Sequence, residues 1–207
     1  DEDSIYHELN FKYQDSDEIS DQSYVGLSDD DFRIDPHARY GLTAYDEMDN
    51  KHEQWSVNYL ADFGNLEFSA TIYENDFTRN WFKVDKIDNK KIYGLGNGIN
   101  NIIDAANLGK AGASAILNGT NTQAVEIKLK NNNRTYTSEG TDLKIQYNTD
   151  RQSLTVGYRS TEDSEDRFQI YEYADWTRGK LGPLTKGEAP GYSSNNRLTY
   201  SEATAFY

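Results

Sequence analysis

Arginine is the residue type in this sequence whose chemistry relates most readily to a ligand. Five arginines lie in or beside long polar stretches of a strongly acidic chain: Arg33, Arg39, Arg79, Arg167 and Arg178. A guanidinium fork matches the two oxygens of a carboxylate, so these residues could hold an anionic ligand. For any single arginine, pairing with a neighbouring acid is the simpler interpretation.

Acidic side chains form three clusters, at residues 15–21, 29–31 and 162–166. The first begins like a calcium loop, but Ile19 falls where a ligand oxygen should be and Asp21 where the turn glycine is expected. We interpret all three as hydrated loop surface, with weak calcium binding as the lesser alternative. Acids are so frequent that no pair stands out for acid–base catalysis by paired carboxylates.

Other catalytic chemistry has little support in the sequence. The three histidines, His7, His37 and His52, lack the spacing of a zinc site. Residues 94–98 (GLGNG) lack the third glycine and the Lys-Ser/Thr of a phosphate loop. There is no cysteine and no Gly-x-Ser-x-Gly motif. We therefore expect no enzyme, no metal and no cofactor.

The composition excludes some classes of partner. The formal net charge of −14 argues against nucleic acid and against electrostatic docking on anionic lipid. Hydrophobic residues make up 36% of the 207 positions, yet there are 16 tyrosines, which is atypical of a disordered chain. A polar, tyrosine-rich chain is typical of β structure with hydrated surfaces.

Alternating side chains predict two hairpins. In residues 55–72, apolar and polar residues alternate on both sides of Gly64-Asn65, which can form a tight turn. The same pattern in residues 142–159 surrounds a turn at 148–151. Further strands are predicted at residues 5–13 and 198–207, giving roughly six to eight strands in all.

Three long polar stretches connect these strands, at residues 14–53, 80–123 and 160–197. Within the second stretch, Ile99, Ile102, Ile103 and Ala106 have helical spacing and predict a short helix. Short turns that alternate with long loops are typical of outer-membrane barrels. No apolar run is long enough for a membrane-spanning helix, but barrel strands give a weaker hydropathy signal.

Four segments resemble the TonB-dependent outer-membrane receptors of the ferric-dicitrate type. Residues 23–32 and 35–40 (SYVGLSDDDF, DPHARY) are similar to the family's TYLGLTDADF and DPYRRY, and residues 73–83 (YENDFTRNWFK) to YRNDFHRNWYK. Residues 132–140 (NNRTYTSEG) resemble NNREYYSRG, and residues 156–169 (VGYRSTEDSEDRFQ) resemble VGLRYHEDEEDRFQ. The order and spacing also match, although Thr135 and Ser160 depart from the pattern.

The resemblance implies an all-β fold, in which residues 1–207 form part of an antiparallel transmembrane β-barrel domain with long extracellular loops. The plug domain and the remaining strands are absent. Leu66, Phe68, Ala70 and Ile72 would face lipid, and their polar neighbours would face the lumen. Aromatic residues expected near strand ends would form the girdle at the membrane surface: Trp55, Tyr73, Trp81 and Phe82.

The function implied is TonB-dependent uptake of a ferric chelate, such as ferric citrate or another siderophore, across the bacterial outer membrane. The expected partners are the chelate, outer-membrane lipid, and the TonB–ExbB–ExbD complex acting through the absent plug. Arg33, Arg39, Arg79 and Arg167 are the candidate ligand-binding residues. The alternatives are a soluble β-sandwich ligand-binding module and, with less support, a hydrolase with paired carboxylates.

Overall fold

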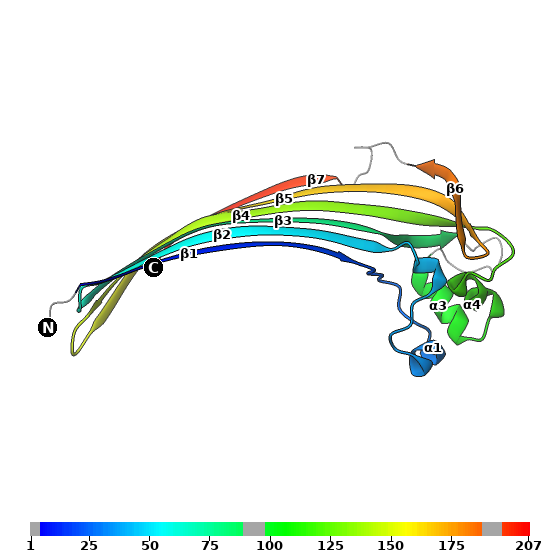
Figure 1. Cartoon of the computed structure of the whole chain (residues 1–207), viewed down its shortest axis with the longest axis horizontal. Coiled ribbons are helices and arrows are strands. Elements are labelled where there is room, and N and C mark those ends of the chain that lie inside the picture. Colours follow the sequence, from blue (N-terminus) through cyan, green and yellow to red (C-terminus); the bar gives the residue numbers. More distant parts are fainter. Residues whose placement is uncertain (1–4, 89–97, 188–195) are drawn as a thin grey trace.

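The chain forms one antiparallel sheet with a small helical cluster at one end (Figure 1). The computed structural model describes residues 5–88, 98–187 and 196–207. The strand order is β1-β2-β3-β4-β5-β6, and β7 also pairs with β5. The strands are β1 (Tyr6–Ser20), β2 (Glu47–Asp62), β3 (Leu66–Asp88), β4 (Val125–Asn148), β5 (Ser153–Thr177), β6 (Lys180–Gly187) and β7 (Arg197–Phe206). The all-β prediction is confirmed.

Both predicted hairpins are present, and their turns lie at the end of the sheet opposite the helices (Figure 1). Gly64 has a φ of 81°, which a side chain would disfavour, and so it allows β2 to turn directly into β3. At the second turn, the Thr149 hydroxyl accepts hydrogen bonds from the backbone N–H groups of Arg151 and Gln152. These local bonds fix the register of the long β4–β5 pair.

The strands are longer, and the connections shorter, than the polar stretches predicted. Residues 14–20 and 47–53 lie in β1 and β2 rather than in a loop, and residues 80–88 continue β3. The prediction of a loop at residues 160–197 was wrong for residues 160–187, because β5 continues to Thr177 and β6 follows it, and residues 188–195 lie outside the described residues. Polar and charged side chains are frequent in these segments, so no clear alternation marked them as strands.

Four short helices occupy the remaining described connections. They are α1 (Asp29–Ile34), the 3₁₀ helix η1 (Gly41–Thr43), α3 (Ile99–Asn107) and α4 (Ala111–Asn118). The helix predicted from Ile99, Ile102, Ile103 and Ala106 is confirmed as α3, while α4 was not predicted. Among the described residues, no helix combines the length and the apolar character needed to cross a membrane.

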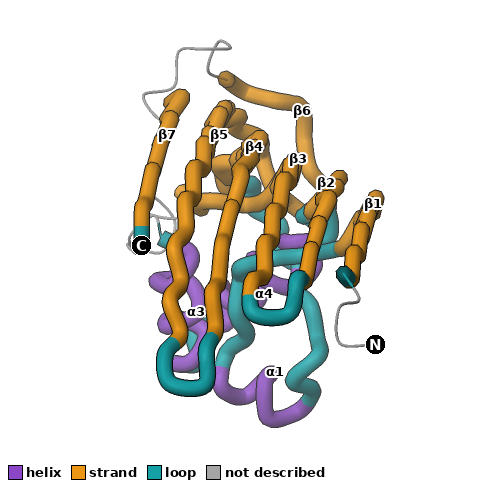
Figure 2. The backbone as a smooth tube through the Cα atoms, turned by 90° about the vertical axis from the view of Figure 1, so that its left-hand side faces the viewer, coloured by secondary structure: helices purple, strands orange, loops and turns teal. Residues whose placement is uncertain are grey.

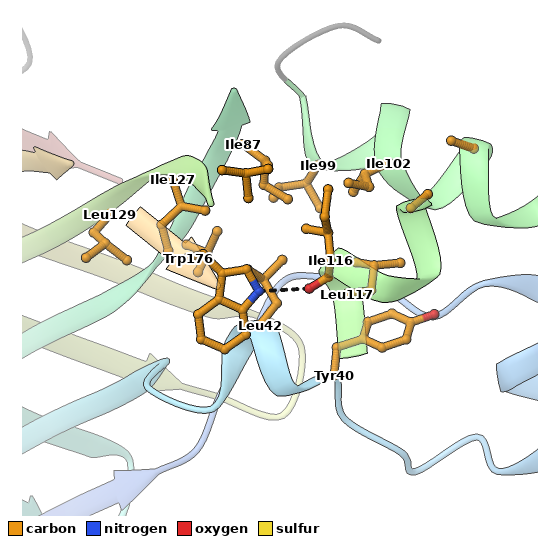
Figure 3. Packing of buried hydrophobic residues seen from close by; sticks show 14 of the residues in the cluster. Tyr40, Leu42, Ile87, Ile99, Ile102, Ile116, Leu117, Ile127, Leu129 and Trp176 are labelled. Carbon is orange, nitrogen blue, oxygen red and sulfur yellow. Dashed lines mark hydrogen bonds between the residues drawn. The ribbon is translucent and has the colours of Figure 1, made fainter. Parts of the chain in front are cut away.

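The buried core lies where these helices pack on the ends of β3, β4 and β5 that are remote from the hairpin turns (Figure 3). Ile102 and Ile116 from the helices and Ile127 from β4 are almost fully buried there. The Trp176 indole N–H donates to the Ile116 carbonyl over 2.9 Å, which ties α4 to β5. This hydrophobic contact accounts for the fixed position of the connections, since most helical stability comes from tertiary packing.

Away from the helices the sheet is a single layer of strands (Figure 2). Cross-strand pairing places Phe68, Ile145 and Val156 on one side, which we call the apolar face. Their chain neighbours Glu67, Gln146 and Thr155 pair on the opposite side, which we call the polar face. Alternation then assigns every residue of these strands to one of the two faces.

Candidate functional site

Four arginines form one row across the polar face. Arg79 of β3 is directly opposite Arg134 of β4, Arg134 is opposite Arg167 of β5, and Arg167 is opposite Arg197 of β7. Neighbouring strands lie about 4.8 Å apart, so the row extends over roughly 14 Å. Four like charges directly opposite one another repel, and an anion in contact with the row would relieve that repulsion.

Three members of this arginine row have no carboxylate partner in the part of the chain that the structure describes. Among the described residues, Arg79, Arg167 and Arg197 are in no ion pair. The Nε atoms of Arg79 and Arg167 are shielded from solvent and have no hydrogen-bond partner within residues 5–88, 98–187 and 196–207. Buried donors are normally satisfied, so these two atoms indicate a missing acceptor.

Arg134 is the exception, because its Nη1 donates to Glu165 Oε1 over 3.0 Å. The same nitrogen donates to the Tyr136 hydroxyl over 3.1 Å. Next to it, the Asn132 side-chain oxygen accepts from Gln169 Nε2 over 2.5 Å. Arg134 is therefore held in place by side chains on its own strand and on β5.

Lysines and aromatic rings continue the cationic surface toward the helices. Lys83 and Lys130 lie directly opposite each other, and Lys83 Nζ is 3.5 Å from the Trp81 ring centroid and 3.8 Å from that of Tyr24. Burial, and after it the charge of Lys130, lower the pKa of Lys83 to about 8. Burial also lowers the pKa of Lys130, and the arginine row contributes to that shift. The local potential is thus positive in a chain of net charge −14.

The structure separates the predicted arginines. Arg79 and Arg167 lie in the row, whereas Arg33 is on α1 and pairs with Asp30 over 2.7 Å on an exposed surface. Arg39 donates to the carbonyls of Thr43 and Asp46, which fastens the connection between β1 and β2. Arg33 and Arg39 therefore bond to neighbouring groups of their own loop, which was the alternative interpretation for single arginines.

Sequence reasoning missed Arg134 and Arg197. Both are in strands, but no pattern in the sequence shows which residues of distant strands are opposite each other. Arg134 and Arg167 lie at equal distances from the centre of the β4–β5 turn, but that equality has meaning only once the register of the hairpin is known. Counting from Gly64, Arg79 is 15 residues away, and only the hairpin registers convert that count into a position.

A row of four glutamates lies on the apolar face. Glu74, Glu139, Glu162 and Glu202 are opposite one another across β3, β4, β5 and β7. Three of them line an open groove of about 310 Å³ that also contains Trp55, whose indole N–H donates to Glu74 over 2.9 Å. Within the described parts of the chain, no three acidic or histidine side chains converge as a metal site would require.

The structure also locates the three acidic clusters that were identified in the sequence. Residues 15–20 and 162–166 lie in β1 and β5, so the interpretation of these segments as loops was wrong. Residues 29–31 form the first turn of α1, where the Ser28 hydroxyl caps Asp31 N–H. Acids are favourable at a helix N-terminus, which gives this cluster a structural role. Of the glycine-rich segment 94–98, all but Gly98 lies outside the described residues.

The aromatic residues expected near strand ends lie within the strands. Trp55 is in the middle of β2, and Tyr73, Trp81 and Phe82 are inside β3. Tyr73 and Trp81 are on the polar face, while Trp55 and Phe82 are on the apolar face. Of the four, Trp55 is the one adjacent to the glutamate row.

In comparisons with known proteins, no family model matches the chain, and neither the curated proteins nor the solved structures give a match.

Proposed function

We propose that this chain is a segment of a plugged outer-membrane β-barrel receptor for TonB-dependent uptake of an anionic ferric chelate. The observation that carries the proposal is the arrangement of two surfaces on one sheet. An exposed apolar band covers one face near the turns, and the arginine row lies on the opposite face, further along the same strands.

The apolar band has the dimensions that a lipid-facing surface needs. Its members are Leu9, Phe11, Val57, Tyr59, Leu66, Phe68, Ala70, Ile72, Leu143, Ile145, Tyr147, Leu154, Val156, Tyr158 and Phe206. Along β3 it extends from Leu66 to Ile72, roughly 20 Å at the rise of a strand. The lipid-facing band of such barrels is about 25 Å tall. Leu154, Val156 and Ile145 are 62%, 56% and 49% exposed, which is unfavourable in water for so many neighbouring apolar side chains.

The position of the glutamate row supports a membrane boundary at the end of the apolar band. Glu74 follows Ile72 by two residues on the apolar face, so the band ends abruptly at a line of carboxylates. Charged side chains are costly on the lipid face and become tolerable near the interface. In the proposed receptor this row lies at the outer surface of the membrane, where the Trp55 ring also belongs.

The arginine row then lies outside the membrane and faces the lumen. Arg79 is seven residues beyond Ile72 on β3, roughly 23 Å further from the turns. An anionic chelate that enters from outside would meet the lysines first and the arginines next. Arginine forks bind carboxylates in a bidentate manner, which suits a ferric complex of citrate or another carboxylate siderophore.

Binding of ferric citrate to the full-length protein in detergent tests this proposal. Because a hydrogen bond to a charged group is strong, Arg79→Gln and Arg167→Gln should each weaken binding about tenfold or more. Arg33→Gln removes the same charge from α1 and should leave binding within about twofold, since surface charges act weakly at a distance. Equal losses for all three variants, or none, would contradict a site at the arginine row. A protein that is monodisperse in water without detergent would favour the soluble binding module instead.

A further inference from the structure

The middle of the arginine row is occupied by a carboxylate of the protein itself. The Glu165 carboxylate lies 3.0 Å from Arg134 Nη1, and the two side chains are 27% and 23% exposed. Partial shielding strengthens such a pair relative to one on the open surface. A ligand carboxylate that approached Arg134 would therefore have to displace Glu165.

Glu165 divides the row into two groups of arginines that form no ion pair within the described parts of the chain. Arg79 is on one side of Arg134, and Arg167 with Arg197 is on the other side. Arg79 and Arg167 are two strand spacings apart, about 10 Å. A small ligand with one anionic group can reach one of these groups, whereas a ligand with anionic groups on opposite sides can reach both.

We propose that Glu165 is a specificity-determining residue that withholds Arg134 from ligands with a single anionic group. The row then favours chelates that present two or more carboxylates about 10 Å apart. This inference rests on the proposed role of the arginine row in binding anions. It adds that selectivity comes from the Glu165 carboxylate, which competes with the ligand for Arg134, as well as from the arginines that attract the ligand.

The nearby Asp163 provides a matched control. Asp163 lies on the same strand and the same face as Glu165, two residues away, and it is exposed. Among the described residues it forms no ion pair with any arginine. Glu165→Gln and Asp163→Asn therefore remove the same charge from the same surface, but only the first releases Arg134.

The experiment compares the affinities of glycolate, a monocarboxylate, and of ferric citrate for the full-length protein in detergent, with intrinsic tryptophan fluorescence as the readout. Glu165→Gln should raise the affinity for glycolate about tenfold and reduce the preference for ferric citrate over glycolate. Asp163→Asn should change both affinities by less than about threefold, because its effect is screened. Circular dichroism of both variants checks that the sheet is retained.

Equal changes in the two variants would overturn the inference, because Glu165 would then act through its charge alone. An unchanged preference in Glu165→Gln would overturn it as well. If Arg79→Gln and Arg167→Gln weaken ferric citrate binding in the same assay, the arginine row is supported as the anion site whatever the result for Glu165→Gln. If those two variants bind normally, the proposed function fails at this site.

Discussion

Asp46 is a buried carboxylate at the helical end of the sheet. It is 1% exposed, and its Oδ1 accepts the backbone N–H of Val84 over 2.9 Å at the part of β3 that extends beyond β2. Its Oδ2 is buried and has no hydrogen-bond partner among the residues that the structure describes. Burial raises the pKa of Asp46 from 3.8 to about 6, although the Val84 bond and the nearby cations oppose that rise.

This shift predicts a pH dependence of local stability. Unfolded Asp46 binds a proton near pH 3.8 and folded Asp46 near pH 6, so between these values the folded state holds more protons. Stability therefore falls by about 1–3 kcal/mol as the pH rises from about 4 to about 6, and acidification restores it. Hydrogen exchange of the Val84 amide, corrected for its intrinsic rate, measures this effect. Asp46→Asn should remove this pH dependence of local stability. If the dependence is unchanged in the variant, it arises from another group.

Gly140 on β4 lies beneath the ring of Tyr73 from β3. A Cβ at Gly140 would lie 2.7 Å from the Tyr73 hydroxyl oxygen and 2.8 Å from ring carbons. Gly140→Ala should therefore destabilise the fold by about 1–3 kcal/mol, because the ring must move out of its packed position. Gly26→Ala is the control, since nothing lies within 4 Å of its added Cβ. The urea midpoint of unfolding should be lower for Gly140→Ala than for Gly26→Ala. Equal midpoints would show that the Tyr73 ring can move aside at no cost.

At the level of elements, the sequence predicted those strands whose two faces differ. Residues 55–72 and 142–159 alternate clearly, and both form the hairpins that were expected. Residues 80–88 of β3 and 160–177 of β5 were placed in loops, because frequent polar side chains obscure the alternation there, although Val84, Ala174 and Trp176 are buried against the helices. Strand pairing and packing against the helices hold these segments in place, and neither is visible in a single sequence.

The candidate site was predictable only in part for the same reason. Arg79 and Arg167 were named because their charge stands out in an acidic chain, but Arg33 and Arg39 met the same criterion. Arg134 and Arg197 become candidates once the registers of three strand pairs are known. Residue type identified the chemistry, and the long-range register identified the place.

The two faces of β4 provide a prediction about the membrane. Ile145→Arg adds a charge to the apolar band, whereas Gln146→Arg adds the same charge to the polar face one residue later. If the band faces lipid, the first variant should lose about 2–4 kcal/mol of stability in bilayers and the second less than about 1 kcal/mol. Urea titrations in lipid vesicles give the two free energies of unfolding. Equal losses would indicate that both faces of β4 meet the same environment.

At the scale of the whole molecule, the sheet is open on both sides. Within the described part of the chain, β1 has one neighbour, β2, and β7 pairs with β5 alone. In lipid each unpaired edge would leave backbone groups unsatisfied, so a spanning sheet must close with further strands. The proposed receptor therefore requires strands beyond those described, together with the plug through which TonB, ExbB and ExbD would act.

The most direct test of the proposal is the environment of the two faces in a bilayer. The chain contains no cysteine, so a single cysteine can carry a fluorophore at Val156 on the apolar face or at Thr155 on the polar face. With the full-length protein in vesicles, lipid-bound quenchers should quench the label at position 156, and aqueous iodide should quench the label at position 155. Quenching of both labels by iodide, with no effect of the lipid quencher, would contradict a membrane-spanning sheet.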